Sequence, residues 1–436
     1  MSPVEDTPAA RGYSWYVVAV LILAYTLSYV DRSILTLMVA PIRASLAISD
    51  VQLSLLHGLA FAVFYTFLGM PIGRLVDTRR RTTIVACGIG LWSVMTGLCG
   101  FARSFGTMFA ARIGVGVGEA ALSPAAYSML ADRFAGKRLV RALSVYQSAI
   151  YVGPGIATVI AGMLLQRLHP IDSVIGHFEP WQQVFVLIGL PGVLVAMLVA
   201  TLREPRRRGA GANEPLPSLA LVMRHLKSQR GAYGLLILGF ACQSIAWNGA
   251  AAWIPTNFIR HYGWTPADVA IGYGPAIAFG GTSGILFGGW LAGALRDRGW
   301  RDANIRVGII AAAGALPFGI AAPLMPTGAW SLTLVCGFLF CGAMPYGGAA
   351  AALQDITPNR MRGQVSAIYL FWLNLAGIGC GPTIVALTGA HVYGGDDGIG
   401  RAISTVIAIA SSLAVMILVC NLAPYRKALD QAAIAP

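Results

Sequence analysis

Apolar residues occur in long continuous stretches along this chain, separated by short segments rich in charge, proline or glycine. Each stretch can cross about 30 Å of hydrocarbon as a helix that rises 1.5 Å per residue. The ten-residue alternation typical of a membrane β-barrel does not occur. The pattern predicts an all-α integral membrane protein with 12 transmembrane helices, at roughly 14–40, 50–73, 82–102, 106–131, 141–166, 181–202, 231–258, 267–295, 304–325, 330–354, 363–390 and 399–422.

The composition agrees with a membrane environment. Of the 436 residues, 56% are hydrophobic and only 11% are charged, and the mean hydropathy is +0.68. A soluble domain carries about 25% charged residues. The charges here are too few to cover a soluble globule of this length, and so apolar a chain is neither disordered nor collagen-like.

The positive charge has a marked sidedness. The net charge is +13, and 24 of the 31 Lys and Arg residues lie in the termini and in the loops on one side of the predicted bundle. Only five lie in loops on the other side. Because basic loops stay in the cytoplasm, this bias predicts a multi-pass protein of the cell (inner) membrane with both termini cytoplasmic. It also accounts for the charge without nucleic-acid binding.

A polar stretch at 203–230 divides the chain into two predicted six-helix bundles, at 1–202 and 231–436. The segment 73–77 recurs 220 residues later at 293–297, and a segment beginning at Asp132 recurs at Asp355. Such in-order matches indicate an internal duplication. Two similar bundles around a central cavity are a design of secondary transporters.

The segment 73–81, Gly-Arg-Leu-Val-Asp-Thr-Arg-Arg-Arg, resembles the loop 2–3 signature of the major facilitator superfamily, with a weaker copy at 293–298. Within that superfamily the first half resembles the Spinster family. The matching segments are 29–32, 61–65, 69–71, 91–96, 112–120, 123–124 and 128–132. This resemblance implies the superfamily fold and a substrate such as a lysophospholipid or sphingoid phosphate. An Asp-Arg in the first span and a Glu in the fourth also resemble the anion:cation symporters, which import organic acids.

Two acidic residues lie well inside predicted spans, Asp31 and Glu119, and two arginines accompany them, Arg32 and Arg112. Intramembrane charges are expensive and are functional candidates by default. A carboxyl near the midplane can exchange a proton near neutral pH. We therefore predict a relay in which Asp31 and Glu119 carry protons and Arg112 binds an anionic head group or a deprotonated carboxylate. Arg32, adjacent to Asp31, is a further substrate or relay candidate, and the outer gate and snorkelling are its alternative roles. The alternative is a set of buried ion pairs that only holds helices together.

A second group of residues is assigned to gating, on the superfamily signature. Asp77 with Arg81 is interpreted as the inner gate, and the dipole of a helix N-terminus in the other half can attract Asp77. The candidate gating residues are Gly73, Asp77, Arg81, Arg138, Arg141 and Asp297.

The second half has no acidic or basic residue deep in its spans, so its side of the cavity is predicted to be amphipathic. The substrate candidates there are polar or aromatic, namely Trp247, Asn248, Tyr346 and Asn374. His57, in the second span, is a further candidate that can join the Asp31 region. Each of these residues, taken alone, is more often part of ordinary packing than a ligand.

These observations predict a proton-coupled secondary transporter of an amphipathic or anionic small molecule, lysolipid-like or sphingoid-like, working by alternating access. The alternatives are a proton symporter that imports organic or aromatic carboxylates, and a multidrug/proton antiporter. The expected partners are protons, a small-molecule substrate and the bilayer, and a monomer is expected. Enzyme motifs, cofactor motifs and metal-ligand spacings are not found in the sequence.

Overall fold

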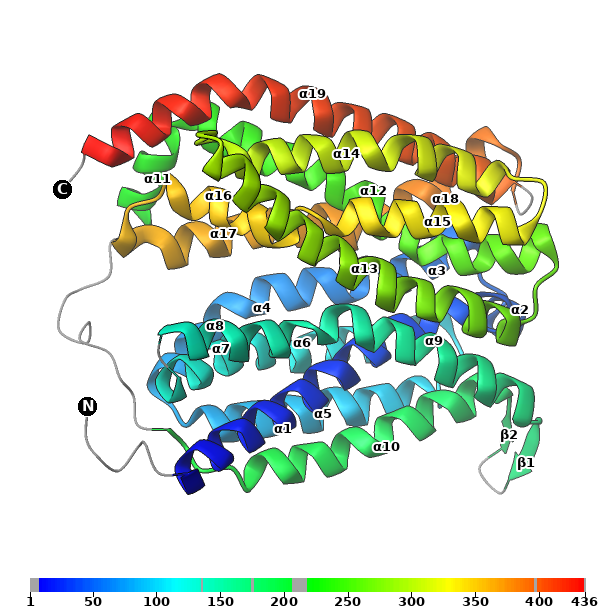
Figure 1. Cartoon of the computed structure of the whole chain (residues 1–436). Coiled ribbons are helices and arrows are strands. Elements are labelled where there is room, and N and C mark those ends of the chain that lie inside the picture. The colour runs from blue at the N-terminus through cyan, green and yellow to red at the C-terminus, as the bar shows by residue number, and fades with distance from the viewer. Residues whose placement is uncertain (1–7, 135, 174–175, 206–217, 396–397, 435–436) are drawn as a thin grey trace. The chain divides into compact units, whose positions relative to one another are not determined.

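A computed structural model describes residues 8–134, 136–173, 176–205, 218–395 and 398–434, almost all of them helical (Figure 1). In the first half the elements are α1 (Pro8–Ser33), η2 (Ile34–Leu37), α2 (Val39–Leu46), α3 (Asp50–His57), α4 (Leu59–Thr78), α5 (Arg81–Cys99), α6 (Phe105–Glu119), α7 (Leu122–Arg133), α8 (Gly136–Gln147), α9 (Ala149–Arg167), β1 (Ile171–Ser173), β2 (Gly176–Phe178) and α10 (Pro180–Ala200). They are followed by α11 (Leu219–Ser228), α12 (Arg230–Tyr262), α13 (Pro266–Asp297), α14 (Ala303–Ala321), η3 (Ala322–Leu324), α15 (Gly328–Ala343), α16 (Tyr346–Asp355), η4 (Asn359–Met361), α17 (Arg362–Asn374), η5 (Leu375–Cys380), α18 (Gly381–Val392) and α19 (Ile399–Ile434).

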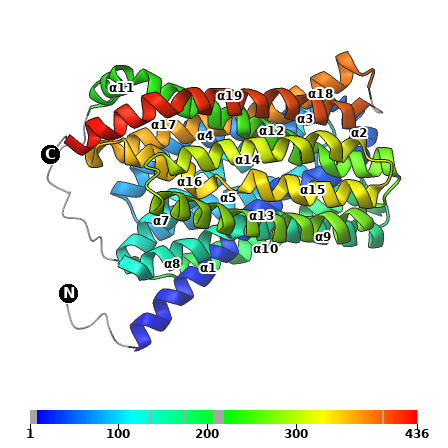
Figure 2. The ribbon, with the colours of Figure 1, turned by 45° about the horizontal axis from the view of Figure 1, so that its top comes forward.

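The chain forms two compact units. The first contains Met1–Leu56 and Ala60–Ala212, and the second contains His57–Leu59 and Asn213–Pro436. In the first unit α5 packs along α10 and α6, and α1 packs along α9. In the second, α19 packs along α12 and α14, as Figure 2 shows. The predicted borders at 202/203 and 230/231 stay a prediction.

Eleven helical segments of the described chain are long and apolar enough to cross a membrane, against the twelve predicted. The difference lies at the predicted span 106–131. It is divided into α6, of 15 residues, and α7, of 12 residues, by a turn at Ala120 and Ala121. The helical periodicity extends across this turn, so the sequence did not reveal it. A turn of the same kind at Met344 and Pro345 separates α15 from α16, which still count as one segment, so the number of twelve spans stays a prediction.

Large apolar side chains cover the outer surface of these helices. Ile271 and Phe279 of α13 are 73% and 76% exposed, and Leu194 of α10 is 64% exposed. A soluble protein rarely exposes contiguous apolar surface of this kind. Together with the eleven apolar helices, it makes lipid the solvent of this surface, as predicted.

Two local departures from straight helices were not predicted. A short antiparallel hairpin pairs β1 with β2, and Ile171 lies opposite Phe178. Phe178 packs edge-on against Phe101, which is a tertiary contact that local sequence does not reveal. In the eleventh predicted span, η5 is a π-helical turn between α17 and α18. It contains Gly379 and precedes Pro382, consistent with a bend at this glycine- and proline-rich site.

Candidate functional site

The centre of the candidate site is the carboxylate of Glu119, at the end of α6. Ser28 Oγ and Arg32 Nε of α1 both donate to Glu119 Oε2, each at 2.5 Å. Ser28 and Arg32 are four residues apart and therefore lie on one face of α1. Glu119 is only 1% exposed. The charged pair thus lies inside the first unit, where a charge is tolerated only if it is paired.

Aromatic rings enclose the Arg32 guanidinium. Its Cζ lies 4.4 Å from the ring centre of Phe61, 4.9 Å from that of Tyr65 and 5.0 Å from that of Tyr29. The negative faces of aromatic rings attract a cation at these distances. In the sequence, the only sign of this arrangement is that a polar and an aromatic residue, Ser28 and Tyr29, precede Arg32 by about one helical turn. The role of Arg32 as a relay, gate or snorkelling residue stays a prediction.

Asp31 and Arg112 form a second contact beside the first. Arg112 Nη1 donates to the backbone carbonyl of Asp31 at 3.3 Å, and both residues are buried. An ion pair between these two side chains does not form among the described residues. Consecutive side chains leave α1 about 100° apart, so Arg32, and not Asp31, points to Glu119. Asp31 Oδ1, Arg112 Nε and Glu119 Oε1 are buried without a hydrogen-bond partner in the described structure.

The site can therefore offer both charges and unsatisfied polar atoms. Two carboxylates and two guanidinium groups cancel when all four are ionised. Buried polar atoms without partners are costly. Such atoms are available to a proton or to a polar ligand group.

The candidates of the second unit lie within that unit as follows. Trp247 stacks on Phe338 with ring centres 5.7 Å apart. Asn248 Nδ2 donates to the carbonyl of Ser244 at 2.9 Å. Tyr346 is 47% exposed and Asn374 is half-buried. Trp247 and Asn248 are thus held by their own helix bundle.

His57 groups with the second unit, in the segment His57–Leu59. It is half-buried there. Its assignment to the Asp31 region stays a prediction.

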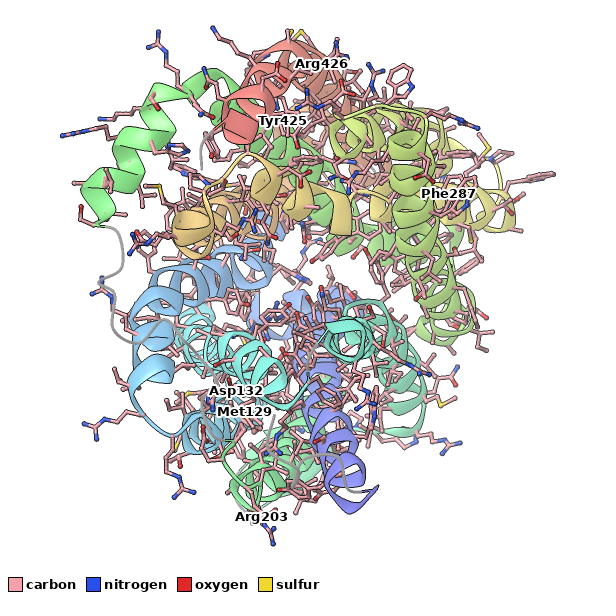
Figure 3. All side chains as sticks on the ribbon, turned by 60° about the vertical axis from the view of Figure 1, so that its left-hand side comes forward. Met129, Asp132, Arg203, Phe287, Tyr425 and Arg426 are labelled. Carbon is pink, nitrogen blue, oxygen red and sulfur yellow. The ribbon has the colours of Figure 1, made fainter. Side chains whose placement is uncertain are left out.

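Arg81 is the gating candidate with the most extensive contacts. It is 1% exposed, at the start of α5. It forms ion pairs with Asp132 and, at 2.7 Å, with Glu204. Its Nη2 donates to the Pro205 carbonyl at 2.8 Å. Asp132 lies near the end of α7, and Figure 3 labels it.

The network of Arg81 is closed within the first unit. Burial alone raises the pKa of Glu204, but hydrogen bonds from Thr82 and Arg81 outweigh it and lower that pKa. Arg81 thus fastens the loop after α10 to α5 and α7.

The other gating candidates are less constrained. The side chain of Asp77 lies outside the described residues, so its pairing stays a prediction. Gly73 lies in α4, Arg138 and Arg141 are exposed on α8, and Asp297 is exposed at the end of α13.

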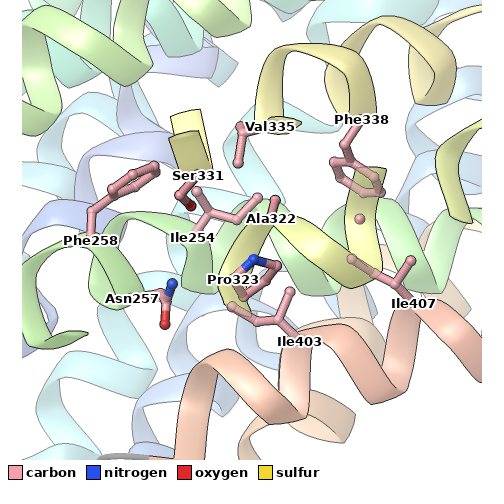
Figure 4. A pocket seen from close by; sticks show the side chains of 11 residues that line it. Ile254, Asn257, Phe258, Ala322, Pro323, Ser331, Val335, Phe338, Ile403 and Ile407 are labelled. Atoms are coloured by element: carbon pink, nitrogen blue, oxygen red, sulfur yellow. The ribbon is translucent and has the colours of Figure 1, made fainter. Parts of the chain in front are cut away.

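One small pocket lies in the second unit, between α12, η3, α15 and α19 (Figure 4). Its wall is apolar except for Asn257 and Ser331. It contains none of the predicted site residues. In the described part of the chain, no three His, Cys, Asp or Glu side chains gather in a way that could hold a metal ion.

The sequence matches the family model described as Major Facilitator Superfamily over residues 21–382. The chain belongs to the Major Facilitator Superfamily. This superfamily comprises membrane transporters, so the predictions of a transporter rather than an enzyme, and of the superfamily fold, are confirmed.

Solved structures and relatives add detail within the superfamily. The chain superposes on a bacterial homologue of the human lysosomal transporter Spinster with a TM-score of 0.78 and 25% identity, covering 97% of this chain and 98% of that one. It is 26% identical to an MFS-type efflux pump of Mycolicibacterium smegmatis, over 95% of this chain and 94% of the pump. It is 30% identical to a probable galactarate/D-glucarate transporter of Bacillus subtilis, over 46% of this chain and 44% of that protein. The predicted resemblance to Spinster proteins is thereby confirmed.

Proposed function

We propose that this superfamily member is a proton-coupled secondary transporter of an amphipathic, anionic small molecule, lysolipid-like or sphingoid-like, that works by alternating access. The proposal rests chiefly on one observation. Glu119 holds Arg32 and Ser28 through a single oxygen, while Asp31 and Arg112 beside it keep polar atoms without partners.

The charge balance of these four residues supports coupling to protons. When Asp31, Glu119, Arg32 and Arg112 are all ionised they neutralise one another, and an added anion would leave the buried site negatively charged. Protonation of one carboxyl leaves a net positive charge, which an anion can neutralise. Because buried unpaired charge costs several kcal/mol, a proton and an anionic substrate favour each other's binding.

The four residues have different parts in this scheme. Among the described residues, Arg112 donates one hydrogen bond, to a backbone carbonyl of α1 at 3.3 Å. It can exchange that weak bond for an anionic head group. Arg32 is held by Glu119 and by three aromatic rings. Protonation of Glu119 weakens the hold on Arg32. We assign proton coupling to Glu119 and Asp31 and anion binding to Arg112.

The polar and aromatic candidates of the second unit suit an apolar substrate body. Trp247, Asn248, Tyr346 and Asn374 carry no charge, so they supply apolar and hydrogen-bonding surface rather than a second ion site. This division favours a substrate with one anionic end. The resemblance to the Spinster family, which implies a lysophospholipid or sphingoid phosphate, agrees with this class of substrate.

The similarity to a sugar-diacid transporter favours a second candidate function, the proton symport of organic carboxylates. The same residues serve it, with Arg112 on the carboxylate. The similarity to an efflux pump favours a third, a multidrug/proton antiporter. Two arginines in one buried site oppose the binding of cations there.

The topology and assembly are also proposals. We propose that both termini are cytoplasmic, on the distribution of Lys and Arg, and that the protein works as a monomer in the cell (inner) membrane. Cysteine labelling of Lys427→Cys, at an exposed position near the end of α19, from each side of the membrane tests the orientation.

The test of transport uses purified protein in liposomes, with and without an imposed pH gradient. Lysophospholipids, sugar acids and aromatic carboxylates are supplied in turn, and both substrate uptake and internal pH are recorded. We expect gradient-dependent transport by the wild type and loss of gradient dependence in Glu119→Gln. Glu179→Gln, in the exposed cap of α10, is the matched control.

Full gradient-driven transport by Glu119→Gln contradicts the proton-coupling proposal. Transport of carboxylates without lysolipids selects the second candidate function. Acceptance of neither class contradicts both.

A further inference from the structure

A charged cavity lies in the second unit, remote in sequence from the candidate site. It is a pocket of about 400 Å³ formed by the loop between α13 and α14, the start of α14 and the end of α19. One water occupies about 30 Å³ of liquid, so the pocket has room for a polyatomic group. We refer to it as the basic pocket.

Four arginines and two aspartates line the basic pocket, and it therefore carries a net positive charge. Asp302 accepts from Arg306 at 2.8 Å and from Arg426 at 2.7 Å. Arg301 pairs with Asp430 at 2.6 Å, with both side chains 60% exposed. Arg298 makes no ion pair with a described residue. The two aspartates thus neutralise only half of the guanidinium charge.

The pocket is built on fixed elements. Gly299 has a φ of 85°, which a glycine adopts without strain, and this turn separates Arg298 from Trp300. Trp300 N donates to the Leu295 carbonyl at 3.1 Å. Its ring lies 3.5 Å from the Arg306 guanidinium. The loop therefore presents its arginines in a defined arrangement.

The end of α19 is fixed as well. The buried hydroxyl of Tyr425 donates to the Ala352 carbonyl at 3.0 Å. This contact positions the next residue, Arg426, which Figure 3 labels beside it. Burial alone raises the pKa of Asp302, but hydrogen bonds from Arg306 and Arg426 outweigh it and lower that pKa. Asp302 consequently stays ionised and orients both guanidinium groups.

The position of the pocket points to its ligand. The loop 298–302 joins two membrane helices directly, since the flanking segments Pro266–Asp297 and Ala303–Leu324 both have the length and hydropathy of a span. Trp300, 41% exposed, is a residue type enriched at the head-group level. Guanidinium groups bind phosphate oxygens in pairs, and basic pockets between membrane helices bind anionic head groups.

We propose that the basic pocket binds a phosphate group, that of an anionic phospholipid in the surrounding leaflet, with Arg298 and Arg301 as its direct ligands. Arg306 and Arg426, tied to Asp302, are positioning residues. Such a lipid would brace the end of α19 against the loop between α13 and α14, independently of the transported substrate.

The test uses the full chain in nanodiscs of phosphatidylcholine with increasing fractions of phosphatidylglycerol, and native mass spectrometry to count the lipids retained. We expect Arg298→Gln with Arg301→Gln to weaken phosphatidylglycerol retention by roughly 10- to 30-fold. This estimate assigns about 1 kcal/mol of binding free energy to each arginine. Both side chains are exposed, so the double variant should fold normally. Asp430→Asn removes a negative charge and is expected to strengthen retention.

Arg79→Gln with Arg80→Gln, in the exposed loop between α4 and α5, is the matched control for general charge. A second arm of the experiment adds inorganic phosphate to the same nanodiscs as a competitor of the lipid. If it displaces the lipid and binds with the same dependence on Arg298 and Arg301, the pocket also takes free phosphate. If the lipid alone binds, the head group is the source.

Equal losses in the two double variants contradict the proposal, because they would show general surface attraction only. Unchanged retention in Arg298→Gln with Arg301→Gln contradicts it as well. Since none of these variants touches Asp31, Arg112 or Glu119, either outcome leaves the proposed transport function to be judged by its own test.

Discussion

Arg32 Nε lies 2.5 Å from Oε2 of Glu119, and this ion pair joins the end of α1 to the end of α6 inside the first unit. Ser28 shares the same oxygen, so one carboxylate atom receives two donors from one face of α1. The pair is placed where α6 ends and the chain turns toward α7. A change in the charge of Glu119 therefore acts directly on the contact between these helices.

Removing one partner of this pair should destabilise the protein strongly. Arg32→Gln leaves the carboxylate of Glu119 buried with only Ser28 as its donor. We expect a loss of about 3–5 kcal/mol, the usual penalty for an uncompensated buried charge. Equilibrium unfolding in mixed micelles measures it.

The control for this prediction is the double variant Arg32→Gln with Glu119→Gln. It removes both charges and should recover most of the loss. If the loss of stability in the double variant equals the sum of the losses in the two single variants, a direct interaction is contradicted.

Much of the fold was predictable because lipid restricts a chain to few structures. The positions of eleven of the predicted spans agree with helical segments, and apolar length alone sufficed to find them. The turn at Ala120 and Ala121 was not predictable, since its residues suit a helix and the break depends on tertiary packing. The hairpin at β1 and β2 depends on tertiary packing in the same way.

The candidate site was predictable in its members and not in its pairing. The cost of intramembrane charge identified Asp31, Arg32, Arg112 and Glu119. Which arginine meets Glu119 depends on the rotation of α1, and apolar patterns specify that rotation loosely on a helix that is apolar on most sides. The roles of these residues in transport remain proposals.

Each unit contains a charge network at corresponding positions of the predicted internal duplication, with the positions of the acidic and basic residues exchanged. In the first unit Arg81, at the start of α5, pairs with Glu204, after α10. In the second, Asp302, just before α14, pairs with Arg426, near the end of α19. Asp302 follows Arg81 by 221 residues and Arg426 follows Glu204 by 222, close to the repeat of the whole chain. Each unit thus ties the same two helix ends together, with the charges exchanged.

The first network should make stability depend on acid pH. The pKa of folded Glu204 lies below its usual value of 4.5. Its stabilising contribution is therefore present above about that pH and is lost as the pH falls through the lower folded value. We expect the melting temperature to fall from near pH 4.5 downward. Glu204→Gln should show a shallower fall, and an identical profile in both proteins would contradict the prediction.

The second network separates a buried from an exposed aspartate within one region. Asp302 is 3% exposed and holds two arginines, whereas Asp430 is 60% exposed and holds one. We expect Asp302→Asn to lower stability by about 2–4 kcal/mol, because buried networks are costly to break. Asp430→Asn should change it by no more than about 0.5 kcal/mol, since exposed pairs contribute little. Chemical unfolding in mixed micelles compares them, and equal effects would contradict the role of Asp302.

The approach of α6 to α5 depends on the absence of a side chain at Gly118. A methyl group there would lie closer than 3.0 Å to the Gly88 carbonyl, the Trp92 backbone nitrogen and the Trp92 Cβ. Because two of these atoms belong to backbone, the helices would have to move apart, and we expect Gly118→Ala to cost about 1–3 kcal/mol. Gly106, also in α6, has no atom within 4 Å of such a methyl group. Gly106→Ala should therefore be neutral or stabilising by up to about 1 kcal/mol through helix propensity. Thermal unfolding of the two variants in the same detergent tests the contrast. A loss confined to Gly118→Ala would show that the close packing of α5 and α6 beside Glu119 contributes to stability, and equal effects would contradict it.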